Sequence, residues 1–125
     1  MSTGPSILIV EDDLDIRDTV SQILEDEGYP VASAANGQEA LDYLRGADLP
    51  GLILLDLMMP VMNGWQFRTE QQRDPRLSAV PVVVLSADSN VQEKAASLGA
   101  VGCIQKPIHL SDLLDTVDRF RLTAH

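Results

Sequence analysis

Four short apolar runs of the sequence are each followed directly by side chains that can take part in chemistry. Glu11 and Asp12 follow the first of these runs and Asp56 follows another, while Ser86 and Lys106 follow the two nearest the carboxyl end of the chain. Three carboxylates held a few ångströms apart raise one another's pKa unless a cation lies among them. Oxygen ligands without a group of His or Cys favour a hard divalent ion, Mg²⁺ or Mn²⁺, over zinc. The residue types therefore predict a magnesium site beside a lysine.

Asp56 is the candidate for a covalent role in this set. Taken alone it would be interpreted as a turn or cap aspartate, and Ser86 and Lys106 as ordinary turn and surface residues. A carboxylate beside Mg²⁺, an ammonium group and a hydroxyl has what an aspartyl-phosphate nucleophile needs, because cations stabilise the phosphoryl group as it transfers. The set therefore indicates phosphoryl transfer to Asp56. Asp13 and Asp15, by contrast, are interpreted as carboxylates that cap a helix.

The apolar runs alternate with helical patterns along the chain. Strands are predicted over 7–10, 31–34, 52–55, 80–85 and 101–104. Helical spacing of apolar residues recurs over 16–24, 40–44, 64–68, 91–98 and 110–120, and Ser111 or a neighbour is expected to cap the last helix. Five alternations with continuous apolar strands predict an α/β domain with a parallel sheet covered on both faces. In such a sheet the ligand site lies outside the carboxyl ends of the strands, which brings the chemical residues to one edge.

Length and charge restrict the remaining possibilities. The 125 residues predict a single domain over 1–125, with its core over about 6–121 and no separate output domain. Nineteen acidic residues against nine basic ones give a net charge of −10, which disfavours direct binding to nucleic acid or to anionic membranes. The lone cysteine, Cys103, cannot form an internal disulfide and is interpreted as a small buried residue. No apolar run approaches the roughly 20 residues that cross a bilayer. We expect a cytoplasmic protein.

The sequence resembles the receiver domain of response regulators, the phosphoacceptor module of two-component signalling. The resemblance extends from Ile7 to about Phe120. Four segments carry it in order: Ile-Leu-Ile-Val-Glu-Asp-Asp at 7–13, Leu-Leu-Asp-Leu-Met-Met-Pro-Val-Met-Asn-Gly at 54–64, Pro-Val-Val-Val-Leu-Ser-Ala at 81–87 and Lys-Pro at 106–107. It implies a flavodoxin-like, doubly wound sheet of five parallel strands in the order 2-1-3-4-5, with five helices.

The resemblance also implies roles for the acidic residues. Asp56 would accept a phosphoryl group from the phosphohistidine of a sensor histidine kinase or a histidine phosphotransfer protein. Asp12 and Asp56 would bind Mg²⁺ directly, and Glu11 would act through water. The backbone carbonyl of Met58 would complete the protein ligands.

Lys106, in the family, pairs with the phosphoryl oxygens, Ser86 moves its hydroxyl toward them, and the bond between Lys106 and Pro107 is cis. Cys103 is the larger departure from the family, because it stands where many receivers carry a Tyr or Phe that swings inward on activation. A cysteine cannot signal activation by such a rotation of an aromatic side chain. We therefore expect the signal to travel through the loop 86–88 and the helix 91–98.

The resulting prediction is a stand-alone receiver that relays phosphorylation to a downstream protein, as a monomer or a phosphorylation-dependent dimer. Its kinase is expected to dock near the first helix, and its target on the helix 91–98, the fifth strand and the last helix. The receiver would assist its own phosphorylation and dephosphorylation without being an enzyme. Two alternatives stay open: a receiver-like interaction module that works without phosphate, and a receiver excised from a larger regulator or hybrid kinase.

Two other functions of similar folds fit the residues less well. A flavin phosphate site needs a neutral loop after the first strand, and Glu11, Asp12 and Asp13 would repel the phosphate. A phosphohydrolase resembling haloacid dehalogenases would have a second Asp two residues after Asp56, where this chain has Met58. Turnover of an external substrate is therefore disfavoured.

Overall fold

A computed structural model of the chain describes residues 6–46 and 49–120. Within these residues five strands form one parallel sheet in the order β2-β1-β3-β4-β5. The strands are β1 (Ile7–Val10), β2 (Val31–Ala34), β3 (Leu52–Asp56), β4 (Val82–Ser86) and β5 (Gly102–Gln105). The helices are α1 (Leu14–Asp26), α2 (Gly37–Gly46), α3 (Gly64–Arg73), α4 (Val91–Ser97) and α5 (Leu110–Phe120). The predicted flavodoxin-like fold and strand order are confirmed.

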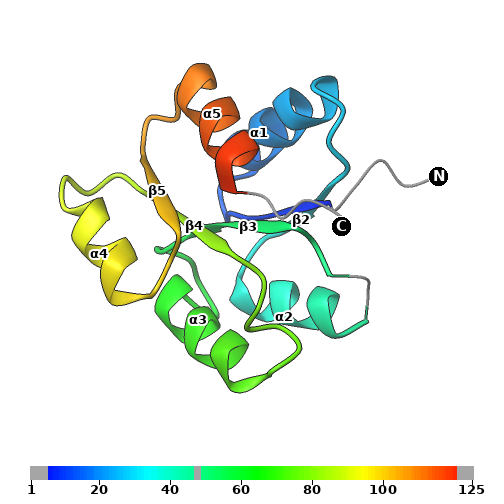
Figure 1. Cartoon of the computed structure of the whole chain (residues 1–125), viewed down its shortest axis with the longest axis vertical. Helices are drawn as coiled ribbons and strands as arrows, with labels where there is room; N and C mark the ends of the chain where they lie inside the picture. Colours follow the sequence, from blue (N-terminus) through cyan, green and yellow to red (C-terminus); the bar gives the residue numbers. More distant parts are fainter. Residues whose placement is uncertain (1–5, 47–48, 121–125) are drawn as a thin grey trace.

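Helices cover both faces of the sheet. In Figure 1, α1 and α5 lie on one face, and α2, α3 and α4 lie on the other. Successive side chains of a strand point to opposite faces, so Ile7 and Ile9 pack with the core under α1 and α5 while Leu8 and Val10 pack with the core under α2 and α3. Every residue of β1, β3 and β4 is buried. These three strands form a buried support, and the predicted site lies at or near their carboxyl ends.

Two helices begin as their sequences indicate, and one does not. The Asp13 carboxylate accepts hydrogen bonds from the backbone N–H groups of Asp15 and Ile16, which confirms its capping role at α1. Asn63 and Gln66 form a reciprocal capping box at α3. Ser111, however, lies inside α5, which begins at Leu110. Ser111 therefore does not cap this helix, because the helix already begins one residue before it, and a cap by a neighbouring residue stays a prediction.

The start of α3 packs tightly against the end of β3. A Cβ atom at Gly64 would lie 2.8 Å from Cα of Leu57 and 3.0 Å from the carbonyl oxygen of Asp56. The backbone N–H of Gly64 also donates to the carbonyl oxygen of Leu57, at 3.0 Å. Only glycine allows this approach, so the residue type at position 64 helps to hold the segment that follows Asp56.

Within residues 6–46 and 49–120, no helix is both long enough and apolar enough to cross a membrane.

Candidate functional site

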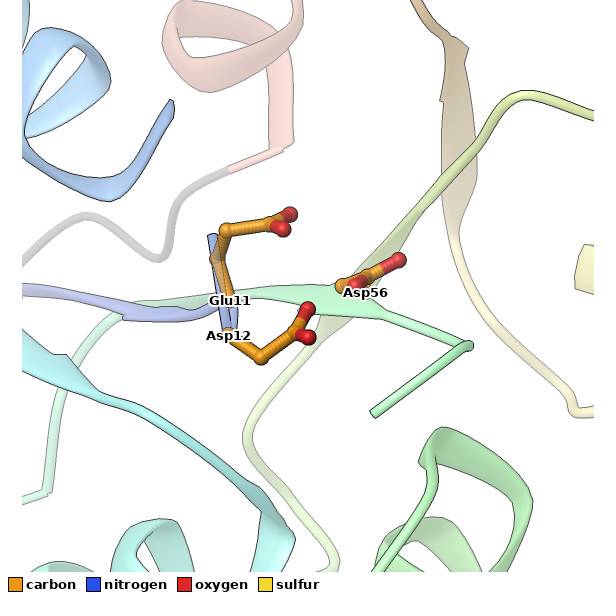
Figure 2. A group of neighbouring side chains, drawn as sticks. All are labelled: Glu11, Asp12 and Asp56. Atoms are coloured by element: carbon orange, nitrogen blue, oxygen red, sulfur yellow. The ribbon is translucent and has the colours of Figure 1, made fainter. Parts of the chain in front are cut away.

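Three carboxylates converge at the carboxyl edge of the sheet. The backbones of β1 and β3 pair in parallel register, with Val10 beside Leu55, so the residues that follow Val10 lie next to Asp56. Figure 2 shows Glu11, Asp12 and Asp56 grouped at the ends of β1 and β3, and one ligand oxygen of each lies within 4.8 Å of those of the other two. Glu11 and Asp56 are buried, at 1% and 4% exposure, whereas Asp12 is exposed. The site therefore combines two buried carboxylates with one that is open to solvent.

Lys106 reaches this cluster from the end of β5. Its Nζ atom lies 2.9 Å from Oε2 of Glu11 and 3.4 Å from Oδ1 of Asp56. Its backbone N–H donates to the carbonyl oxygen of Ser86 at 2.8 Å, which ties the lysine to the end of β4. The peptide bond between Lys106 and Pro107 is cis, as the resemblance implied. The lysine thus lies beside the carboxylates by virtue of the strand order, since it is far from them in sequence.

The charges of the cluster shift the pKa values of two of its members. Burial, together with the negative charge of Glu11, raises the pKa of Asp56 to about 7, although the charge of Lys106 lowers it. Burial lowers the pKa of Lys106, but the hydrogen bond to Glu11 and the charges of Asp56 and Glu11 outweigh burial and raise it. Lys106 is therefore a cation at neutral pH. Further positive charge beside Asp56 would stabilise its ionised form.

This shift predicts how stability depends on pH when no divalent ion is bound. The pKa of Asp56 is about 7 in the folded protein against an ordinary value of 3.8. As the pH rises, the unfolded chain therefore releases this proton at a lower pH than the folded protein does. The stability that this group contributes is therefore present below about pH 4 and is lost as the pH rises to about 7. Asp56→Asn removes the titrating group and should lessen this loss. Urea denaturation of both proteins in a chelator, at about pH 4 and about pH 8, measures it, and an identical pH dependence in the two would contradict it.

Ser86 and Met58 complete the predicted set. Ser86 is the last residue of β4 and is buried, and its Oγ accepts a hydrogen bond from the backbone N–H of Asp88 at 3.1 Å. The backbone N–H of Met58 donates to Oδ1 of Asp56 at 3.4 Å, while its side chain is 69% exposed. A depression of about 250 Å³ is lined by Asp56 and every other predicted site residue, namely Glu11, Asp12, Met58, Ser86 and Lys106. The fold brings the whole predicted set together.

Lys94 is the residue near this depression that the sequence did not indicate. It lies on α4, forms an ion pair with Asp88, and its Nζ lies 5.7 Å from the centre of the Trp65 ring. Asp88 itself lines the depression. No periodicity or motif links Lys94 with Trp65, because the contact depends on how α3 and α4 pack side by side.

Cys103 and Trp65 are both half-buried and pack against one small apolar cluster. This cluster contains Leu57, Val84, Val91 and Ala95. Cys103 was expected to be buried, and its partial exposure reflects its place on β5, the edge strand of the sheet. Burial by its neighbours still raises the pKa of the thiol. For Trp65 the contacts favour a packing role over that of an exposed anchor.

Comparisons with known proteins agree with this geometry. The family model of the response regulator receiver domain matches residues 7–118. Response regulator Rre1 of Synechocystis sp. is 43% identical over 88 residues, which cover 70% of this chain and 38% of that protein. An uncharacterised 14.6 kDa protein of Leptolyngbya boryana is 34% identical over 118 residues, which cover 93% of this chain and 89% of that protein.

Solved structures give the same result. The chemotaxis response regulator CheY4 of Vibrio cholerae superposes with a TM-score of 0.86 at 33% identity, covering 94% of this chain and 99% of that chain. A response regulator receiver protein of Pseudomonas putida superposes with a TM-score of 0.85 at 28% identity, covering 95% and 99%. Some curated relatives are much longer, and the chain spans 38% of Rre1 and 47% of the transcriptional regulator RpaA of Synechocystis sp.. The family model, the strand order and the matched sequence together lead to one conclusion: the chain belongs to the family of response regulator receiver domains of two-component systems.

Proposed function

We propose that this receiver accepts a phosphoryl group on Asp56 in a Mg²⁺-dependent reaction and thereby changes its binding to a partner protein. The observation that carries the proposal is the convergence of buried Asp56 with two further carboxylates and the ammonium group of Lys106. A carboxylate is a weak nucleophile and needs cations on both sides of the transferring group. The arrangement supplies one cation in the protein and a donor set for a second.

The residues present fit a hard divalent ion. Three carboxylates offer ligand oxygens within 4.8 Å, and Lys106, the one ammonium group that contacts them among residues 6–46 and 49–120, leaves an excess of negative charge. Asp12 and Asp56 would bind Mg²⁺ directly, Glu11 through water, and Met58 through its backbone carbonyl. The exposure of Asp12 leaves room for the water ligands that Mg²⁺ keeps. When bound, Mg²⁺ supplies charge stabilisation to the phosphoryl oxygens, and Mn²⁺ is expected to substitute for it.

The transfer itself exchanges one bond for another. A carboxylate oxygen of Asp56 forms a bond to phosphorus as the phosphorus–nitrogen bond of the donor phosphohistidine breaks. The electron pair of the broken bond stays on the imidazole nitrogen, which takes up a proton. Lys106 would neutralise a phosphoryl oxygen, and the hydroxyl of Ser86 would donate a hydrogen bond to another.

The phosphodonor is expected to be a sensor histidine kinase or a histidine phosphotransfer protein. An apolar groove of about 250 Å³ beside the site supports docking of such a partner near α1; its lining includes Ile16, Val20, Ile23, Pro107 and Leu110. The output partner is expected to bind on α4, β5 and α5, and the receiver is expected to be a monomer or a phosphorylation-dependent dimer. The net charge of −10 disfavours direct binding to DNA, so the partner is expected to be a protein. The extent of the domain unit, 1–125 with a core over about 6–121, stays a prediction.

The test is the intact mass of the protein after incubation with phosphoramidate and Mg²⁺. We expect the mass of one phosphoryl group to be added, and the addition to disappear when a chelator removes the metal. A protein that binds Mg²⁺ and yet gains no mass from phosphoramidate or from a phosphorylated histidine phosphotransfer domain would contradict the proposal. That outcome would favour an interaction module that works without phosphate.

A further inference from the structure

Lys94 joins three elements on the α3–α4 side of the acceptor site. It lies in α4, it forms an ion pair with Asp88 of the β4–α4 loop, and its ammonium group lies over the ring of Trp65 in α3, 5.7 Å from the ring centre. A cation over an indole ring is attracted by the ring's electron density. The Lys94 side chain is 26% exposed and that of Asp88 50%, so water screens this contact only in part.

Asp88 connects this contact to the chemistry. It lines the same depression as Asp56, and its backbone N–H donates to Oγ of Ser86 at 3.1 Å. Lys94 therefore reaches the hydroxyl of Ser86 through a single intervening residue. A turn of the Ser86 hydroxyl toward Asp56 has to break this hydrogen bond or move Asp88 with it, since Asp88 is its donor.

The two ends of α4 are held differently. At its carboxyl end, the Arg68 guanidinium donates to the carbonyl oxygens of Leu98 and Gly99, at 2.8 Å and 3.0 Å. At its amino end, Asn90 makes no capping hydrogen bond with its side chain. Among the contacts of the described residues, the ion pair between Lys94 and Asp88 is thus the side-chain link from α4 back to the loop that follows Ser86.

We propose that Lys94 is a positioning residue of the acceptor site: its ion pair with Asp88 holds the β4–α4 loop, and with it Ser86, in the unphosphorylated position, and the pair separates when Ser86 turns to a phosphoryl group on Asp56. The inference rests on the proposed function, since it requires a phosphoryl group on Asp56. Breaking the pair in advance removes a contact that the phosphorylated arrangement would have to break. Variants without the pair should therefore bind a phosphoryl analogue more tightly.

Beryllium fluoride with Mg²⁺ is the probe, and fluorine NMR measures its affinity. Lys94→Met and Asp88→Asn both remove the ion pair, so each is expected to bind the probe about two- to fivefold more tightly, the range that a partly exposed pair can supply. Lys94→Arg keeps a cation at the same place and is expected to match the wild type. The two pair-breaking variants change the net charge near the site in opposite directions. If the affinity instead falls in one and rises in the other, charge alone governs binding and the proposal is overturned.

Trp65 provides a spectroscopic readout, because it is the one tryptophan in the sequence. In the wild type, its emission should change when beryllium fluoride binds, since Lys94 loses the ion pair with Asp88 that helps to hold it beside the ring. In Lys94→Met most of this change should be absent. An unaltered emission change in that variant would overturn the proposal. The intact mass after phosphoramidate treatment separates the two failures: a wild type without an adduct contradicts the proposed function, whereas an adduct with unaltered affinities contradicts the role of Lys94 alone.

Discussion

Asp56→Asn is expected to abolish the phosphoryl adduct that the wild-type protein forms with phosphoramidate and Mg²⁺. The substitution keeps the shape of the side chain but replaces the carboxylate oxygens with an amide, which has no lone pair nucleophilic enough to attack phosphorus. It also removes one of the three carboxylates that hold the ion. Intact mass spectrometry of the two proteins, after identical incubations, measures the loss.

A matched control separates this loss from a general effect of charge. Asp15 is an exposed carboxylate in the first turn of α1 that does not line the depression. Asp15→Asn should therefore keep the full adduct. Unfolding does not explain the loss in Asp56→Asn, because the raised pKa of Asp56 means that its negative charge destabilises the metal-free fold. An adduct of undiminished yield in Asp56→Asn would contradict the assignment, and peptide mapping would then locate the true acceptor.

Arg68→Met is expected to lower the free energy of unfolding by about 2–4 kcal/mol, since hydrogen bonds to charged groups are worth about 1.5–3 kcal/mol each and are not additive. Arg68 is 8% exposed. Besides the carbonyl oxygens of Leu98 and Gly99, its guanidinium contacts Oε1 of Gln71 at 2.8 Å. Gln71 is fully buried and donates to two further carbonyl oxygens. Methionine fills a similar volume but cannot donate hydrogen bonds, so the carbonyl oxygens of Leu98 and Gly99 and the Oε1 atom of Gln71 lose their donor.

Urea denaturation followed by circular dichroism measures this effect, with Arg73→Met as the matched control. Arg73 lies on the same helix, and its side chain is 73% exposed in a pair with Glu70. Removing it should cost no more than about 0.5 kcal/mol. Equal midpoints for the two variants would show that the buried network around Arg68 contributes nothing specific. A larger loss for Arg68→Met would establish that this network holds α3 to the end of α4.

The order of the strands and helices, and the residues of the candidate site, could be predicted from the amino-acid sequence alone. Apolar runs such as 52–55 predicted their strands because burial on both faces demands continuous apolar residues. The residues after those runs, Asp56 and Lys106 among them, were identified because strand ends in a parallel sheet meet at one edge. The capping role of Asp13 was also predictable, since a cap depends only on the next few residues. Predictions of this kind need only short stretches of sequence and the parallel arrangement of the strands.

How these residues contact one another could not be predicted without the folded structure. The Nζ atom of Lys106 lies 2.9 Å from the carboxylate of Glu11 and 3.4 Å from that of Asp56, an order that no sequence pattern predicts. The raised pKa of Asp56 likewise depends on burial that only the folded chain defines. Arg68 and Lys94 were unremarkable helix residues in the sequence, yet one joins α3 to the end of α4 and the other contacts the acceptor loop. Such contacts depend on side-chain packing between separate elements, and hydrophobic periodicity records which face of a helix is buried but not which polar groups meet there.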